Sequence, residues 1–280
     1  MNDRLVYLSR ASFGRFMDEA AARHSELEEI GFTGEPFMNP DLPGMIGAAL
    51  ARGHRVLVLT NAMRPMQRHK EALTRLFAAY GSRLSLRVSL DHFTRAGHEQ
   101  IRGPRTFAPA LAGLSWLSRA GFSPTVAACL PASADEADCR SGFAALFRAL
   151  DLPLDAFNPA HLILFPDLAD PAPPPEVSEA CWQALHHTGR DLMCAHSRMV
   201  VHRKGAPEPS VVACTLQPYE PRFDLGPSLA AAARSVTLNH PHCARFCVFG
   251  AASCTARSVT LNHPHCARFC VFGAASCTAR

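Results

Sequence analysis

Cysteines in the C-terminal part of this 280-residue chain are the side chains most suited to chemistry. The chain has 11 cysteines, and eight of them lie beyond residue 190. The N-terminal stretch MNDRLVYLSR lacks a signal-peptide pattern, and no apolar run approaches the roughly 20 residues of a membrane helix, so we expect a cytoplasmic protein with no membrane contact. In a reducing compartment clustered cysteines bind metal more often than they form disulfides. We therefore predict a metal site with thiolate ligands.

Five cysteines within 61 residues compete for this site. A 4Fe–4S cluster takes four thiolates, whereas zinc also accepts three cysteines and one histidine. His240 and His242 lie beside Cys243, and spacing alone does not separate iron from zinc. A third interpretation treats these cysteines as small buried apolar side chains. The candidate ligands are Cys194, Cys214, Cys243, Cys247 and Cys254.

The end of the chain is an identical tandem duplication. Residues 235–257 and 258–280 match at every position, and each copy has three cysteines. Solenoid repeats need three or more copies to bury a continuous core. The second copy has no equivalents of Cys194 and Cys214 to complete a site. We therefore expect the first copy to be functional and the second to be a disordered duplicate.

The first 165 residues alternate between strand-like and helix-like periodicity. Five apolar runs predict strands that alternate with five amphipathic helices, which indicates parallel βα units. The series opens on a helix around Phe13 to Ala20. A parallel α/β fold normally opens on a strand, so we expect that the first strand and its following loop are missing. The strand-like runs are 27–34, 56–60, 84–91, 124–130 and 161–165.

Polar residues follow three successive strands. They are the stretches Thr33-Gly34-Glu35-Pro36, Thr60-Asn61 and Ser89-Leu90-Asp91-His92, with Arg102 farther along. Each alone is good turn chemistry. Three in succession are more informative, because the carboxyl ends of parallel strands line one shared pocket.

The stretches EIGFTGEPFMNPDL, VLVLTNAM and LRVSLDHFTRAGHEQIRG resemble, in this order, the core of radical S-adenosylmethionine (SAM) enzymes. The resemblance covers residues 1–165 and implies an α/β fold, a partial (β/α)6 TIM-like barrel that lacks its first strand. It also implies that a 4Fe–4S cluster binds SAM and cleaves it to a 5′-deoxyadenosyl radical, which abstracts a substrate hydrogen.

The resemblance assigns SAM-binding roles to six residues. The backbone of Gly34, Glu35 and Pro36 would bind the amino group of SAM. Asn61 would make a polar contact, Ser89 would contact the ribose or carboxylate region, and Arg102 would pair with the SAM carboxylate.

Two departures from the family pattern count against an active enzyme. One glycine, Gly34, precedes Glu-Pro where the family has two, and the family's C-x3-C-x2-C cluster motif is absent. The ligands of the SAM-binding cluster are therefore missing, and we expect an inactive fragment that is truncated at its N-terminus.

The C-terminal cysteines resemble the SPASM or twitch extension of radical SAM maturases, although their spacing is not standard. This implies one auxiliary 4Fe–4S cluster, with Cys194, Cys214, Cys243 and Cys247 as first choice and Cys254 as alternative. The expected domains are a core at 1–165, a proline-rich linker and helix at 166–190, a cysteine-rich region at 191–257 and the duplicated tail at 258–280.

The functional expectation is thus a radical SAM oxidoreductase or maturase. A peptide is one candidate substrate, and flavodoxin or ferredoxin is the expected kind of electron donor. The net charge of +4 is weak and its bases are scattered, so no nucleic-acid partner is expected. The alternative is a catalytically inert structural or interaction protein that binds zinc or an iron–sulfur cluster.

Overall fold

The computed structural model describes residues 6–23, 27–131, 133–166, 192–238, 240–243 and 247, together with the backbone of strand 267–273. Helices and strands alternate through the first part of the chain. The elements there are α1 (Arg10–Ala22), β1 (Leu27–Gly34), η1 (Pro36–Met38), α2 (Leu42–Ala51), β2 (Arg55–Thr60), α3 (Arg64–Gln67), α4 (Lys70–Tyr80), η2 (Gly81–Arg83), β3 (Leu84–Ser89), α5 (Arg95–Arg102), α6 (Phe107–Arg119), β4 (Thr125–Leu130), α7 (Glu136–Ala149) and β5 (Leu162–Pro166). The C-terminal elements are α9 (Met193–His196), β6 (Ser197–Val201), β7 (Ser210–Val212), η4 (Pro221–Phe223) and β8 (Ala267–Gly273).

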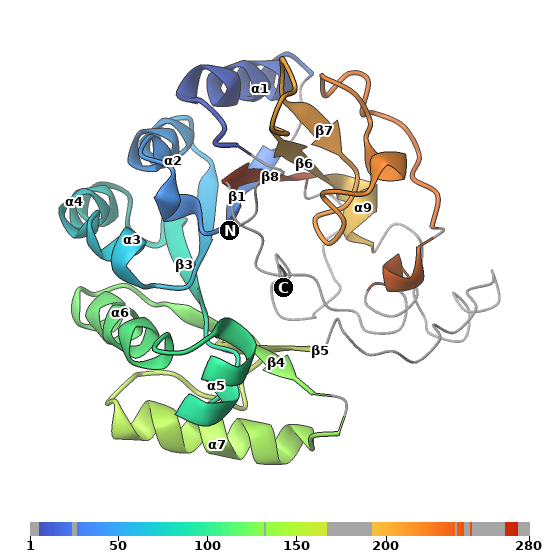
Figure 1. Ribbon diagram of the computed structural model, residues 1–280. Helices are drawn as coiled ribbons and strands as arrows, with labels where there is room; N and C mark the ends of the chain where they lie inside the picture. The colour runs from blue at the N-terminus through green and yellow to red at the C-terminus, as the bar shows by residue number, and fades with distance from the viewer. Residues whose placement is uncertain are drawn as a thin grey trace.

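All eight strands form one sheet in the order β5-β4-β3-β2-β1-β8-β6-β7. Strands β1 to β5 are parallel, and each pairs with the next along the chain. The strands follow an arc, and helices α1, α2, α4, α6 and α7 lie outside it (Figure 1). The predicted alternation of five strands with helices is confirmed, and the fold is that of a partial TIM-like barrel.

Alternate residues of the strands build the core beneath the helices. Ile30 of β1, Val58 of β2, Leu86 of β3 and Val126 of β4 are each buried in one apolar cluster. Each such side chain contributes about 1.5–3 kcal/mol when it leaves water. On the helix side of this core, α1 buries one apolar face, made of Phe13, Phe16, Met17 and Ala20.

The first strand pairs on both sides although the chain enters the sheet from a helix. β1 pairs with β2 on one side and with β8 on the other, both in parallel. β8 also pairs in parallel with β6. The position next to β1, where the sequence predicts a missing strand, is therefore filled from the end of the chain.

This pairing corrects the expectation for the second tail copy, which we predicted to be disordered. Residues 267–273 form strand β8 instead. The physical reason is that unpaired edges of β1 and β6 would leave rows of backbone N–H and C=O groups without partners, and an extended segment satisfies them. The rest of the second copy lies outside the described residues.

A β-hairpin is centred on Gly205. β6 and β7 pair antiparallel, with Met199 opposite Val212, and Gly205 has φ +82° in the connection. The predicted linker and helix at 166–190 fall, except for Pro166, outside the described residues, so their boundaries stay a prediction.

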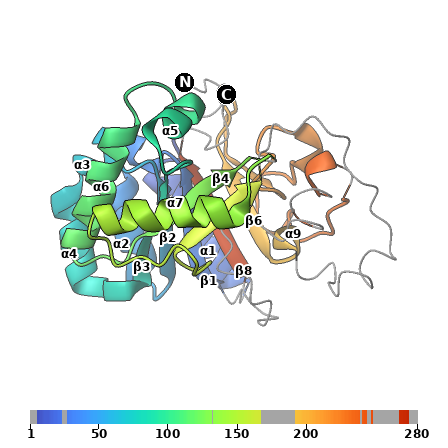
Figure 2. The same ribbon diagram turned by 90° about the horizontal axis from the view of Figure 1, so that it is seen from below.

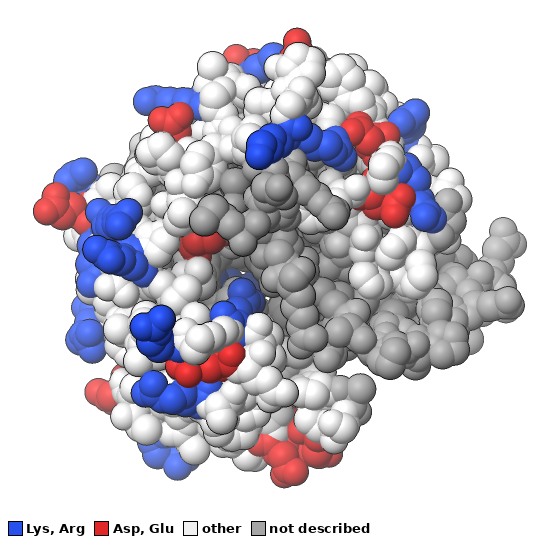
Figure 3. Space-filling model, viewed as in Figure 1, with Lys and Arg blue, Asp and Glu red and all other residues white. Residues whose placement is uncertain are grey.

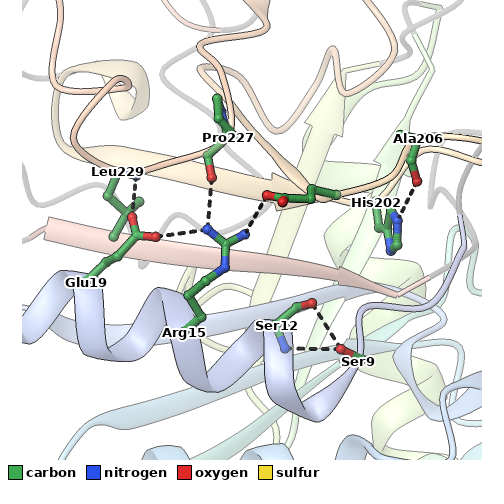
Figure 4. Close-up of polar contacts among 9 residues, drawn as sticks. Ser9, Ser12, Arg15, Glu19, His202, Ala206, Pro227 and Leu229 are labelled. Atoms are coloured by element: carbon green, nitrogen blue, oxygen red, sulfur yellow. Dashed lines mark hydrogen bonds and ion pairs between the residues drawn. The ribbon is translucent and has the colours of Figure 1, made fainter.

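Side chains of helix α1 bind the C-terminal segment 208–229 through polar contacts (Figure 4). Arg15 donates to the Pro227 carbonyl at 3.3 Å and lies 3.9 Å from a Glu208 carboxylate oxygen. Glu19 accepts a 2.8 Å hydrogen bond from the Leu229 backbone N–H. Ser9 caps the start of the helix, because its side chain accepts from the Ser12 N–H at 3.1 Å.

Basic and acidic side chains are interspersed over the face seen in Figure 3. Within the described residues, no helix combines the length and the apolar composition that crossing a membrane requires.

Candidate functional site

The carboxyl ends of β1, β2 and β3 meet at one edge of the sheet. The register pairs Phe32 with Val58 and Thr60 with Val88, so the residues that follow these strands lie side by side. We call this region the strand-end edge; it comprises Gly34–Pro36, Thr60–Ala62 and Ser89–His92. Sequence reasoning placed its SAM-binding candidates here, with Arg102 in the helix that follows β3.

The Glu35 carboxylate joins the ends of β1 and β2. It accepts hydrogen bonds from the Thr60 hydroxyl at 3.0 Å and from the Asn61 backbone N–H at 2.8 Å. The Thr60 hydroxyl oxygen in turn accepts from the Ala62 N–H at 3.0 Å. Glu35 is 6% exposed, so these bonds lie away from water.

Burial raises the pKa of Glu35 to about 7. The Asn61 N–H, the Thr60 hydroxyl, the Phe37 N–H and the charge of Arg102 all act in the opposite direction, because each favours the ionised form. Desolvation is the larger effect, so this carboxyl group changes charge near neutral pH.

The turn after β2 has an unusual backbone at Ala62. Its φ is +57°, in the left-handed region that residues other than glycine rarely adopt. The Asn61 side chain accepts from the Met63 N–H at 2.9 Å, so Asn61 holds the turn itself. The Ala62 carbonyl oxygen rests against Gly113 of α6, where an added Cβ would lie 1.9 Å away.

Arg102 reaches back from the end of α5 to the end of β3. Its Nε donates to the Asp91 carboxylate, and the two side chains are 24% and 11% exposed. A SAM carboxylate would therefore have to share this guanidinium with Asp91, a partner that the sequence prediction did not include. The Asp91 backbone N–H donates to Nδ1 of His98 at 3.2 Å, and burial lowers the pKa of His98.

Two glycines in helices α5 and α7 allow the loop after β3 to pack closely against these helices. A Cβ on Gly97 would lie 2.4 Å from the His92 ring, and one on Gly142 would lie 2.6 Å from the Phe93 ring. The loop is therefore fixed by close packing against α5 and α7.

Gly34 and Ser89, two more of the residues predicted to bind SAM, also lie at the strand-end edge. Gly34 has φ +86°, a conformation that suits glycine, and it ends β1 just before Glu35. Ser89 is the last residue of β3 and is 8% exposed. All six predicted SAM residues are thus in the same part of the molecule; their roles toward SAM stay predictions.

Four of the five candidate cysteines line one small cavity. Its volume is about 20 Å³, room for about one water molecule. Its lining, otherwise largely apolar, includes the first-choice set Cys194, Cys214, Cys243 and Cys247, and also His242. We call it the cysteine cavity. Cys254 lies outside the described residues.

Burial favours the protonated form of three thiols in this cavity, those of Cys194, Cys214 and Cys243. Burial raises the pKa of Cys214 to about 12 and raises those of Cys194 and Cys243 as well. Cys243 further raises the pKa of Cys194, because two thiolates this close repel each other. The backbone N–H groups of Leu216 and Gln217 point at the Cys214 sulfur and act in the opposite direction.

The hairpin explains why Cys194 and Cys214 meet. Cys194 lies in α9, just before β6 begins, and Cys214 follows just after β7 ends. Since β6 and β7 are antiparallel, both positions fall at the same end of the hairpin. Within the described residues, no group of three or more metal-binding side chains stands close enough to hold an ion, so the thiols would have to move inward.

The cysteine cavity and the strand-end edge lie toward opposite ends of the sheet. Ser197, the first residue of β6, pairs with Arg268, which pairs with Glu29 near the start of β1. Gly34 lies five residues farther along β1, about 17 Å along the strand at the usual rise. In Figure 2, α9 likewise lies well below α5.

The α/β part of the chain matches a model of a known protein family. The family model described as Radical SAM superfamily matches residues 4–132. The search of curated proteins found no match.

Among solved structures, similarity is found to SuiB of Streptococcus suis. SuiB bound to S-adenosylmethionine has 12% identity and a TM-score of 0.40, covering 51% of this chain and 31% of that one. SuiB alone has 10% identity and a TM-score of 0.44, covering 62% and 38%. SuiB bound to its precursor peptide SuiA has 10% identity and a TM-score of 0.38, covering 51% and 30%. The matched part of this chain thus spans less than two fifths of SuiB.

The predicted resemblance is confirmed for the core, because residues 4–132 of this chain match the Radical SAM superfamily model.

Proposed function

We propose that the strand-end edge binds SAM and that the chain is the core of a radical SAM oxidoreductase or maturase with a second, cysteine-liganded metal site. The observation that supports SAM binding best is the polar network across three strand ends, from Glu35 through Arg102 to Asp91. It lies within the family match and gathers the residues to which the sequence resemblance assigns SAM contacts.

The strand-end edge offers chemical groups that suit the amino group and the carboxylate of SAM. Gly34 to Pro36 present a backbone turned by the positive φ of Gly34, suited to a ligand amino group. Arg102 offers a guanidinium to a carboxylate, in competition with Asp91. Together with a 4Fe–4S cluster, SAM supplies a 5′-deoxyadenosyl radical for hydrogen abstraction.

This chain by itself is proposed not to cleave SAM. Its 11 cysteines include no C-x3-C-x2-C run that could hold the SAM-binding cluster. What its residues do is bind and orient: Gly34 to Pro36 hold the methionine end of SAM, and Ser89 and Arg102 hold the ribose and carboxylate.

The cysteine cavity fits an auxiliary 4Fe–4S cluster in the type and number of donors. Cys194, Cys214, Cys243 and Cys247 supply four thiols, and N–H groups directed at the Cys214 sulfur would stabilise its thiolate. Metal binding would displace the protons that burial keeps on Cys194, Cys214 and Cys243, so metal affinity would rise with pH.

The alternative function is a catalytically inert metal-binding module, with zinc or an iron–sulfur cluster. The opposite placement of the cysteine cavity and the strand-end edge favours it, because a metal there would fasten the β6–β7 hairpin to the tail without touching SAM. His242 in the lining keeps a site of three cysteines and one histidine open.

Metal analysis and a product assay test these proposals. After anaerobic purification, about four irons and four sulfides per chain would support the cluster. One zinc without sulfide would overturn the iron assignment and support the alternative. Formation of 5′-deoxyadenosine above a no-protein control would contradict the proposed inactivity.

A further inference from the structure

The mechanism proposed above uses only the backbone of Glu35, yet its side chain is the most heavily bonded carboxyl group of the strand-end edge. One oxygen accepts from the Thr60 hydroxyl at 3.0 Å, and the other accepts from the Asn61 N–H at 2.8 Å. The side chain thus ties the residue after β1 to the last residue of β2 and to the turn beyond it.

These bonds continue into the strained part of the turn. Thr60 accepts from the Ala62 N–H at 3.0 Å, so Glu35 reaches Ala62 through one hydroxyl. A left-handed alanine costs about 1–2 kcal/mol, so its surroundings must hold it. On its other side, the Ala62 carbonyl is fixed against Gly113.

We propose that Glu35 is the positioning residue of the strand-end edge: its buried carboxyl group holds the Thr60–Ala62 turn and loosens it on losing its proton. Both forms can make these contacts: the ionised group accepts from the Thr60 hydroxyl and the Asn61 N–H, whereas the neutral group accepts from Asn61 with its carbonyl oxygen and can donate its own proton to the Thr60 oxygen. Burial makes the ionised form costly, because Glu35 is 6% exposed, so the neutral form is favoured while the turn is closed.

The groups that face Glu35 are few. Thr60 and Asn61 come from the end of β2, the Phe37 N–H comes from η1, and the Arg102 charge comes from α5. Arg102 alone among them carries a charge. Its pull on the carboxylate is weaker than the effect of burial, which leaves the pKa of Glu35 at about 7.

The direction of the pH effect follows from linkage. When the turn opens, the Glu35 carboxyl meets water and its pKa returns toward the ordinary 4.5. Between pH 4.5 and about 7 the closed turn holds a proton that the open turn releases, so opening becomes easier as pH rises through this window.

Amide hydrogen exchange of Asn61 and Ala62 tests the inference in the full chain. We expect Glu35→Ala to speed exchange of these amides about tenfold. Glu35→Gln should keep them protected, since an amide can accept from Asn61 and donate to Thr60. After correction for intrinsic rates, wild-type exchange should accelerate by up to about tenfold per pH unit between pH 5 and 7, and Glu35→Gln should not.

Glu28→Gln is the matched control: Glu28 lies in β1, the strand that Glu35 follows, and its carboxylate pairs with Arg55 at 2.8 Å. It should exchange like wild type at Asn61 and Ala62. If Glu35→Ala does not fold, Thr60→Val removes the hydroxyl alone and should speed exchange of the Ala62 amide more than that of Asn61. Wild-type protection in both Glu35→Ala and Thr60→Val would overturn the positioning role, and equal pH profiles in wild type and Glu35→Gln would overturn the proton dependence.

The consequence for SAM rests on the proposed function. We expect SAM affinity to fall as pH rises from 6 to 8 in wild type but to stay level in Glu35→Gln. If SAM does not bind at any pH, the proposed function fails, while the exchange experiment still decides the role of Glu35.

Discussion

The backbone oxygen of Ala62 occupies the space that a side chain on Gly113 would need, with 1.9 Å between that oxygen and the missing Cβ. Gly113 lies within α6, where glycine is unfavourable on backbone entropy alone. Its place is explained by the turn after β2, which carries Asn61 and has no room for any larger residue.

The close approach predicts that Gly113→Ala destabilises the protein. The added methyl group meets backbone, which cannot rotate away, so we expect a loss of about 2 kcal/mol or more in the free energy of unfolding by urea. Gly14→Ala in α1 is the matched control, since nothing lies within 4 Å of its added Cβ. It should be neutral or stabilise by up to about 1 kcal/mol. Equal effects of the two changes would contradict the packing described here.

The free energy of unfolding of the whole protein should depend on pH through the buried Glu35 carboxyl group. Its pKa in the folded chain is about 7 and its ordinary value is 4.5, so the folded state keeps a proton that the unfolded state loses in this window. The free energy of unfolding of wild type relative to Glu35→Gln should fall by about 3 kcal/mol from pH 4.5 to 7 and then level off. A difference that rises with pH would show that burial does not dominate at this site.

The sequence predicted most of the core because its signals there are local. The apolar run at Val56 to Leu59 and the helical spacing of Phe13, Phe16 and Met17 depend on neighbouring residues alone. The Thr33-Gly34-Glu35-Pro36 stretch likewise marked the end of β1. Parallel packing then brought three strand ends together, as such a fold requires.

Contacts distant in sequence were not predictable in the same way. No sequence pattern predicts the contact of Arg102 with Asp91 or that of Ala62 with Gly113, because both contacts depend on how α5 and α6 pack. A glycine inside the apolar helix FAPALAGLSWLSR is a weak signal of close approach that could have been used. β8 was missed because an identical copy made the segment look redundant.

The four-cysteine cavity predicts which single substitutions abolish metal binding. Cys214→Ser should lower metal affinity by more than 100-fold, beyond the roughly 10–100-fold cost of changes outside the ligand set. Cys139→Ser is the control, since Cys139 is buried in α7 and away from the cavity. Inductively coupled plasma mass spectrometry on the purified variants measures the outcome, and full metal content in Cys214→Ser would exclude Cys214 as a ligand.

Strand β8 predicts that the second tail copy contributes to stability. Deleting residues 258–280 exposes an edge of β1 and an edge of β6, with a backbone hydrogen bond worth about 1 kcal/mol at each lost position. We expect a lower melting temperature and more aggregation, read by calorimetry and light scattering. Deleting 274–280 is the matched control, because it leaves β8 whole. Identical melting of the two deletions and wild type would refute a role for β8.

SAM binding tests the central claim most directly. Equilibrium dialysis with labelled S-adenosylmethionine at pH 6, where Glu35 is mostly protonated, should show saturable binding of about one SAM per chain. Arg102→Gln should weaken it by about tenfold or more through loss of a charged partner, whereas Arg75→Gln, an exposed arginine of α4, should leave it unchanged. Absence of saturable binding by a chain that is folded by circular dichroism would contradict the assignment of the strand-end edge as a SAM site.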